Sequence, residues 1–166
     1  MSISRSFSKV LFQDVFRTLS RVFQSQPDYS KHIKIAGHSL HCHFKDPNRQ
    51  NHLLQALTHH PEAPENSSGL DLYVWDESTT DTSLPPLPVD LPTNEGWHYD
   101  KDRYFGLSLP YQKSSIWLDR QTNRAIYYTN DLLQISLAER SAPFLYILSA
   151  WLGLENLHVV HAAALQ

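Results

Sequence analysis

Histidines cluster in one short segment, and their spacing raises the question of a metal site. His41 and His43 are two residues apart, with His38 nearby, so the first two side chains share one face of a strand. Imidazoles placed in this way could ligate a transition metal. However, the sequence contains no Cys-x-x-Cys or His-Glu-x-x-His motif, and Cys42 alternates to the other face. We therefore predict no metal site and interpret the histidines as solvent-exposed strand residues. The other candidate ligands lie in a separate segment: His52, His59 and His60.

Carboxylates dominate the segment from Glu62 to Asp102. It contains ten of them, opposed only by Lys101. Asp100 and Asp102 would chelate a divalent cation only if they converged, and their spacing matches no known calcium loop. We interpret this acidic segment as solvated surface.

The sequence lacks the motifs that bind nucleotide phosphates or attack esters. A P-loop surrounds phosphates with backbone N–H groups and a helix N-terminus, and adds a Lys and a Ser or Thr. None of the five glycines is followed by lysine, and no Gly-x-Ser-x-Gly elbow is present. By itself the chain is therefore predicted to bind no nucleotide in the P-loop manner.

Composition restricts the class of protein. A chain of 166 residues with 41% hydrophobic residues fits one globular domain or most of one. The net charge of −3 argues against a nucleic-acid binder. The lone Cys42 excludes an internal disulfide and suits a reducing cytoplasm. No apolar run approaches the roughly 18 residues of a membrane span. We expect a soluble cytoplasmic protein, and a homo-oligomer is compatible with the sequence.

Residues 1–26 are predicted to form a basic amphipathic helix, followed by a mixed α/β domain over 27–166. This segment contains four basic residues and only one acidic residue, Asp14, and its apolar residues recur at helical spacing. Three interpretations remain open: a helix packed on the domain, a docking or membrane-surface helix, and a transit peptide. The apolar set is Phe7, Leu11, Val15, Leu19 and Val22, with Phe12, Phe16 and Phe23 beside them.

The remaining elements follow from alternation and turn residues. Residues 33–44 read as a strand pair or one long strand, interrupted at Gly37-His38. A short helix is expected over 50–57, with Leu53, Leu54 and Leu57 pointing inward. Residues 77–92 should form no regular element, because prolines remove donors and fix φ. Strands with period two or short apolar runs are predicted at 70–76, 103–109, 114–119 and 124–129, with a hairpin turn at 119–123.

The carboxyl-terminal part is predicted to contain a helix and then a buried strand. Ser136 and Glu139 form a candidate capping box, and Pro143 suits the first turn of the helix that follows. Gly153 is a plausible stop, and the apolar run Leu157–Leu165 reads as a core strand. The expected buried stripe of the helix is Leu145, Leu148 and Leu152, with Trp151 beside it.

Several local patterns occur in an order that resembles HPr kinase-like P-loop serine kinases. The strongest lie between Glu139 and Leu165. The patterns are Trp117-x-Asp119-Arg120, Ala125-x-Tyr127-Tyr128, Glu139-Arg140-x-x-Pro143, a leucine and aromatic helix, and His161-Ala162-Ala163-Ala164. In that family such a strand is soon followed by the Gly-rich phosphate-binding loop, which this chain lacks.

The resemblance implies the N-terminal part of a longer kinase. The implied fold is α/β (α+β-like), with a mixed, largely antiparallel sheet, an N-terminal helix, a helix before the last strand, and an incomplete P-loop kinase-like domain. The implied complete protein transfers the γ-phosphoryl of ATP, with Mg²⁺, to a serine of a protein or peptide. His161 matches the family's histidine near the phosphate site and is the one candidate catalytic residue. The alternative is a non-catalytic module that binds a peptide or protein.

Overall fold

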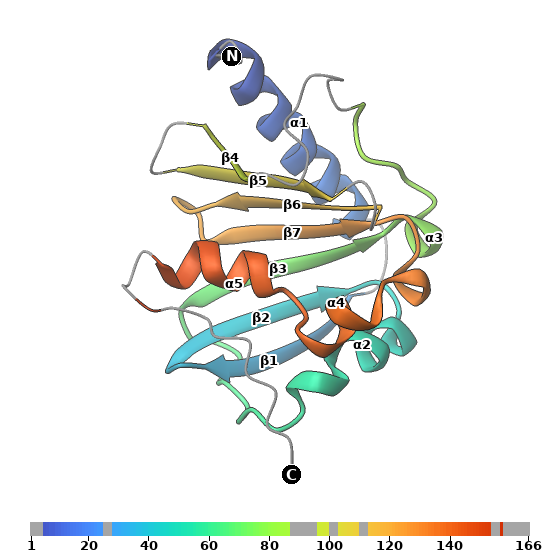
Figure 1. Ribbon diagram of the computed structural model, residues 1–166, viewed down its shortest axis with the longest axis vertical. Helices are drawn as coiled ribbons and strands as arrows, with labels where there is room; N and C mark the ends of the chain where they lie inside the picture. Colours follow the sequence, from blue (N-terminus) through green and yellow to red (C-terminus); the bar gives the residue numbers. More distant parts are fainter. Residues whose placement is uncertain are drawn as a thin grey trace.

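One mixed sheet with helices on both faces forms the protein (Figure 1). The structure, a computed structural model, describes residues 5–24, 28–86, 96–99, 103–109, 113–153 and 157. Within these ranges the strands are β1 (Tyr29–Ile35), β2 (His38–Phe44), β3 (Gly69–Asp76), β4 (Gly96–Tyr99), β5 (Tyr104–Leu109), β6 (Ser114–Asp119) and β7 (Arg124–Thr129). The helices are α1 (Arg5–Gln24), α2 (Pro47–Leu54), α3 (Glu77–Thr80), α4 (Leu137–Ser141) and α5 (Leu145–Leu152), with 3-10 turns η1 (Gln55–Leu57) and η3 (Leu132–Gln134).

The sheet is mixed and largely antiparallel, as predicted. Its described strands lie in the order β1-β2-β3-β7-β6-β5-β4. The pairs β2–β3 and β3–β7 are parallel, and the other four pairs are antiparallel. The predicted interruption in residues 33–44 is a hairpin turn, in which Ala36 and Gly37 have φ of 50° and 86°. Gly37 suits this turn because it adopts positive φ without a steric cost.

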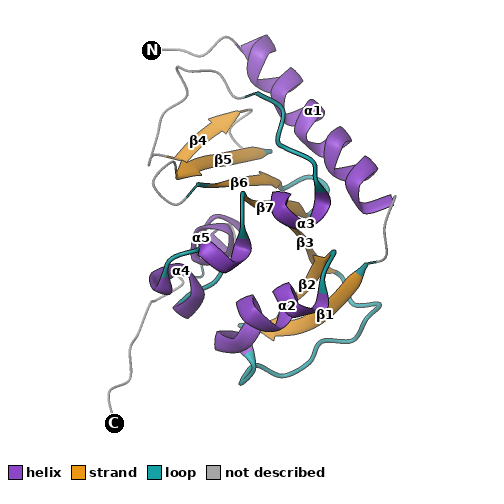
Figure 2. Cartoon of the chain, turned by 90° about the vertical axis from the view of Figure 1, so that its right-hand side faces the viewer, coloured by secondary structure: helices purple, strands orange, loops and turns teal. Residues whose placement is uncertain are grey.

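Each face of the sheet is buried under helices (Figure 2). Along β3, Leu72 points to the face covered by α2 and α5, whereas Trp75 points to the face covered by α1. Both side chains are 0% exposed. Burial on both faces explains why β6, a six-residue strand, is buried at every position.

Helix α1 packs on the sheet, which confirms the first of the three interpretations. Its buried residues recur every three or four positions and include Val15 and Leu19, both 0% exposed. Phe12 stacks on Tyr104 with ring centroids 4.6 Å apart. It also makes an edge-to-face contact with Trp117, with ring centroids 5.1 Å apart. The apolar stripe of α1 is therefore already occupied by the sheet and is not available to a partner or a lipid surface. The side chain of Phe7 lies outside the described part.

The segment after β3 was predicted to contain no regular element, and this is wrong at its start. Residues 77–80 form the single-turn helix α3, because the Asp76 carboxylate accepts a hydrogen bond from the Ser78 N–H at 3.1 Å and caps the turn. Residues 87–92 lie outside the described ranges. The predicted helix at 50–57 begins earlier, at Pro47, where Asp46 caps it, and ends in η1. Its three leucines are buried as expected.

The helix near the carboxyl end begins later than predicted. Pro143 was expected in its first turn, but α5 starts at Leu145. The residue before a proline avoids the helical region, and Ala142 accordingly has φ −138°. Leu148, Trp151 and Leu152 of the predicted stripe are buried as expected, but Leu145 is only half-buried, and Ile147 is fully buried instead. Ser136 caps α4 as predicted, accepting from the Glu139 N–H at 3.2 Å.

Of the predicted terminal strand, the structure describes only Leu157. Its N–H donates to the Leu152 carbonyl at 3.2 Å, and its side chain packs on the core between the sheet and α5. His161 and the other residues of that strand lie outside the described residues. No helix among the described residues has both the length and the apolar character that crossing a bilayer requires.

Candidate functional site

An apolar pocket lies between the sheet and the chain that joins α4 to α5. Its volume is about 230 Å³, and its wall is mostly carbon. Such a concave, apolar site with a few polar groups is the usual form of a binding site. The pocket is lined by Leu53, Leu109, Ile116, Tyr127, Ala138, Glu139, Ala142, Pro143, Phe144, Leu145 and Tyr146.

The turn before α5 shapes this apolar pocket. Phe144 adopts a left-handed conformation with φ 64°, which is costly for a residue with a side chain. Its ring is nevertheless held in place, because the residue is only 3% exposed and the ring makes an edge-to-face contact with Tyr127, with ring centroids 5.7 Å apart. Burial of this ring therefore offsets the backbone strain and fixes the pocket wall.

One carboxylate provides the polar end of the pocket. Glu139 accepts hydrogen bonds from the Tyr127 hydroxyl at 2.7 Å and from the Ser114 hydroxyl at 3.2 Å. Burial, together with the neighbouring charge of Glu139, raises the pKa of Tyr127 far above its usual value. Tyr127 therefore stays protonated and acts as a donor, not as a base. This arrangement suits an apolar group that carries a cation or hydrogen-bond donor.

Exposed apolar side chains occur in the segment that contributes to the apolar pocket, and one of them, Tyr146, lines it. Most large hydrophobic residues of the described chain are buried, yet Leu137 on α4 is 73% exposed and Tyr146 on α5 is 47% exposed. Leu133 in η3 is 51% exposed. Apolar surface concentrated at the edge of a pocket is typical of an interaction site.

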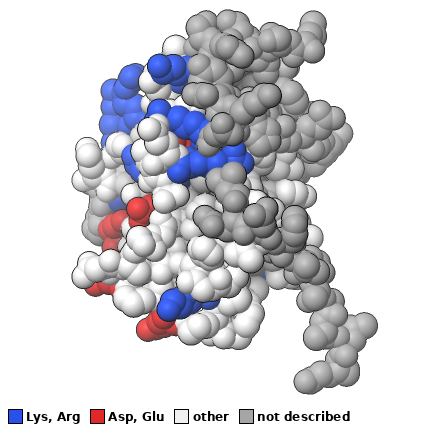
Figure 3. Space-filling model, turned by 90° about the vertical axis from the view of Figure 1, so that its left-hand side faces the viewer, with Lys and Arg blue, Asp and Glu red and all other residues white. Residues whose placement is uncertain are grey.

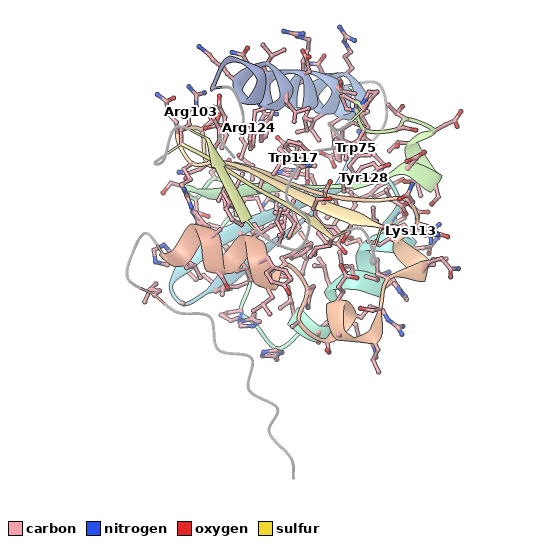
Figure 4. The ribbon with its side chains drawn as sticks, turned by 45° about the horizontal axis from the view of Figure 1, so that its top comes forward. Trp75, Arg103, Lys113, Trp117, Arg124 and Tyr128 are labelled. Atoms are coloured by element: carbon pink, nitrogen blue, oxygen red, sulfur yellow. The ribbon has the colours of Figure 1, made fainter. Side chains whose placement is uncertain are left out.

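A second hollow, the basic groove, lies between α1 and the end of the sheet formed by β5, β6 and β7. Its volume is about 450 Å³, and it is largely open to solvent. Figure 4 shows Arg103 and Arg124 side by side at one end of the interface between α1 and the sheet, with Trp117 and Trp75 within that interface. The basic groove is lined by Phe12, Gln13, Phe16, Arg17, Ser20, Arg103, Tyr104, Asp119, Thr122 and Arg124.

Two arginines of the basic groove are held by aromatic rings and a carboxylate. Arg103 binds both oxygens of Asp119, at 3.2 and 3.1 Å, and its guanidinium lies 4.6 Å from the Tyr104 ring centroid. The Arg124 guanidinium lies 5.6 Å from the ring centroid of Phe16. Stacking of this kind fixes the plane of a guanidinium and leaves donors at its edge.

The predicted solvent-exposed histidines are instead partly or fully buried. His41 is 8% exposed, and Asp71 Oδ1 lies 3.1 Å from His43 Nε2 and 3.6 Å from His41 Nδ1. His38 lies on the other face of β2 and packs against Trp151, with ring centroids 5.7 Å apart. The prediction failed because β3 pairs with β2 and brings Asp71 beside the histidines. No group of three or more ligands arranged for a metal occurs among the described residues.

The histidine–aspartate contacts predict a pH-dependent stability. Burial lowers the pKa of His43, but hydrogen bonds and charge interactions with Asp28 and Asp71 outweigh it and raise the pKa to about 9. A raised pKa means that the stabilisation is complete below about pH 6.5 and is lost as the pH rises through about 9. We expect the free energy of unfolding to fall by about 1–3 kcal/mol over that interval. Urea denaturation at several pH values measures this fall, and His43→Gln should abolish most of it. An equal fall in that variant would contradict the assignment.

The acidic segment is not simply solvated surface. Asp76 is 2% exposed and pairs with Arg49, while Glu77 accepts a hydrogen bond from the Tyr128 hydroxyl. These acids face residues that precede or follow them by tens of positions, so local charge counting misses them. Asp100 and Asp102, the candidate cation ligands, lie outside the described residues.

The two hollows were not foreseen as sites, although signals for them are present in the sequence. Glu139 was predicted as a helix-capping residue, and the nearby Pro143 as part of a helix; together they line the apolar pocket. The sequence shows the excess of basic residues in α1, but it does not reveal that Arg17 of this helix lies near Arg103 and Arg124. Comparison with protein-family models, curated proteins and solved structures gives no significant match.

Proposed function

We propose that this chain is the N-terminal portion of an HPr kinase-like, ATP-dependent serine kinase. The complete protein would act in the cytoplasm and transfer the γ-phosphoryl of ATP to a serine of a protein or peptide substrate. The 166 residues do not fit ATP, since they contain no Gly-Lys-Ser/Thr sequence. We therefore assign no catalytic step to the described residues and regard the fragment alone as inactive.

One observation carries the proposal. Glu139 and Pro143, two residues of the pattern that resembles the family, line the same apolar pocket. The helix that follows, α5, belongs to the same pattern and ends next to Leu157, whose N–H donates to Leu152. Glu139, Pro143 and α5 thus lie next to one another, and in the sequence they directly precede the segment that contains His161. Trp117 and Tyr128, from the other two patterns, lie on the opposite face of the sheet, in the apolar cluster under α1.

Nucleotide binding and the reading frame test this proposal together. Titration calorimetry of the 166-residue chain with Mg²⁺–ATP should show no binding, because the sequence contains no Gly-Lys-Ser/Thr loop to hold the phosphates. The reading frame past Gln166 should encode Gly-Lys-Ser or Gly-Lys-Thr within a few dozen residues. The extended protein should transfer labelled phosphate from ATP to serine, and His161→Ala should slow that transfer.

Two outcomes would overturn the kinase proposal. A stop codon directly after Gln166 would leave no place for the phosphate-binding loop. Micromolar binding of ATP by the 166-residue chain would require a nucleotide site of another kind.

A non-catalytic interaction module is the second candidate, favoured by the apolar pocket and its exposed margin. Tyr146 presents apolar surface at a hollow whose polar end is the Glu139 carboxylate, and Leu137, next in sequence to the lining residue Ala138, is also exposed. A partner would fit by inserting an apolar side chain next to a hydrogen-bond donor. The stop codon that would exclude the kinase would support this candidate.

A further inference from the structure

The basic groove combines positive charge with rigid aromatic support, in a protein whose net charge is negative. Three arginines and one aspartate line it, while the chain as a whole has a net charge of −3. Figure 3 shows Lys and Arg side chains gathered on the upper part of the face that it views. A local concentration of positive charge on an acidic protein attracts a negatively charged ligand to that region.

Each arginine of the basic groove is positioned differently. Arg103 is fixed by two contacts to Asp119, a residue only 6% exposed. Arg124 lies over the rings of Phe16 and Tyr73, with distances from its guanidinium carbon to the ring centroids of 5.6 and 5.4 Å. A guanidinium that is already ordered loses less conformational entropy when it binds an anion.

Arg17 contributes charge that is easily redirected. It pairs with Asp14 at 2.7 Å one turn earlier in α1, and its side chain is 62% exposed. Exposed ion pairs of this type contribute little free energy, so a ligand carboxylate can compete with Asp14. Lys9 and Arg21 extend the basic character along the solvent-exposed side of α1.

The shape of the basic groove distinguishes among anionic ligands. A small metabolite is usually enclosed over most of its surface, whereas this groove is largely open to solvent. A nucleic-acid strand usually follows a longer basic stripe and a basic domain. A short extended segment of protein needs only a shallow channel, with donors for two or three acidic side chains and rings for their methylene groups.

We propose that the basic groove binds an acidic peptide segment of a partner protein, with Arg17 and Arg124 contacting its carboxylates. The inference does not depend on the kinase proposal, because it rests only on described side chains of α1 and the sheet. A kinase would use such a groove to bind its protein substrate at a site distant from the serine that is phosphorylated. An interaction module would use it to bind its partner.

Fluorescence anisotropy with a labelled peptide of alternating serine and glutamate residues tests the proposal. At about 50 mM salt we expect saturable binding that weakens steeply at 200 mM, as screening of exposed charges requires. The same peptide with glutamine in place of glutamate should not bind. Arg17→Glu and Arg124→Gln should each raise the dissociation constant about tenfold or more.

Lys34→Glu provides the matched control for Arg17→Glu. It changes the net charge by the same amount, and its exposed side chain lies on β1, at the opposite edge of the sheet from β4. The dissociation constant of the acidic peptide for this variant should stay within about twofold of the wild-type value, because salt screens the interaction with a distant charge. Arg17 is exposed, so that variant should remain folded, as circular dichroism can verify.

Three results would each overturn the acidic-peptide proposal. One is equal binding of the glutamine peptide, and another is equal weakening by Lys34→Glu and Arg17→Glu. The third is tighter binding of a single-stranded oligonucleotide of the same charge, which would identify the basic groove as a nucleic-acid site.

Discussion

Val15→Asp in α1 is expected to lower the free energy of unfolding by about 4 kcal/mol or more, the largest effect of any substitution considered for this protein. Val15 is 0% exposed and belongs to the same apolar cluster as Trp75 and Trp117. An unpaired carboxylate placed there would either remain charged in an apolar environment or displace α1 from the sheet. The midpoint of urea denaturation, followed by tryptophan fluorescence, measures the loss, because both rings are buried beneath α1.

Val10→Asp is the control for Val15→Asp, since it makes the same change on the same helix. Val10 is 55% exposed, so the free energy of unfolding should change by no more than about 0.5 kcal/mol. Similar midpoints for the two variants would mean that α1 does not depend on the sheet in solution. The docking and transit interpretations of the N-terminal segment would then regain support.

The strands could be predicted from the sequence, but the partners that cover them could not. Alternation identified Leu70, Leu72 and Val74 as one face of a strand, and all three are buried. The opposite face carries Tyr73 and Trp75, and nothing local reveals that a helix some fifty residues earlier covers it. The alternation of residues along a strand shows which side chains share a face of the sheet. Whether that face is buried depends on tertiary contacts.

The sites were less predictable than the fold because each combines distant segments. Ser136 and Glu139 were correctly identified as a cap at the level of the backbone, but the Glu139 side chain is bound by Tyr127, which lies on a strand. The basic groove joins Arg17 in α1 to Arg124 in β7. The spacing of residues in the sequence does not predict that these two arginines lie close together, because this depends on the order of the strands in the sheet.

Arg49→Met is the second substitution with a large expected effect, because it leaves a buried carboxylate without its cation. Arg49 Nε lies 3.1 Å from Asp76 Oδ2, and the two side chains are 15% and 3% exposed. Removing one partner of a buried ion pair costs about 3–5 kcal/mol, here partly reduced by the Ser78 hydroxyl and N–H that still donate to Asp76. The free energy of unfolding from urea denaturation should fall accordingly.

Restoring neutrality should recover part of this loss. In Arg49→Met/Asp76→Asn the amide oxygen can still accept from the Ser78 N–H and cap α3, while the uncompensated charge is gone. The double variant should therefore be more stable than Arg49→Met alone, even though it contains one more substitution. If the double variant is less stable, the carboxylate is not destabilising, and Arg49 acts through its packing alone.

The pH dependence of the Arg49→Met effect separates charge from packing. Burial outweighs the hydrogen bonds and the charge of Arg49, and it raises the pKa of Asp76 above its usual value. Loss of Arg49 should raise that pKa further. A raised carboxyl pKa favours the folded state at low pH, and this contribution is lost as the pH rises through the folded-state pKa. The destabilisation by Arg49→Met should therefore be smaller at pH 4 than at pH 7, whereas a packing defect would cost the same at both.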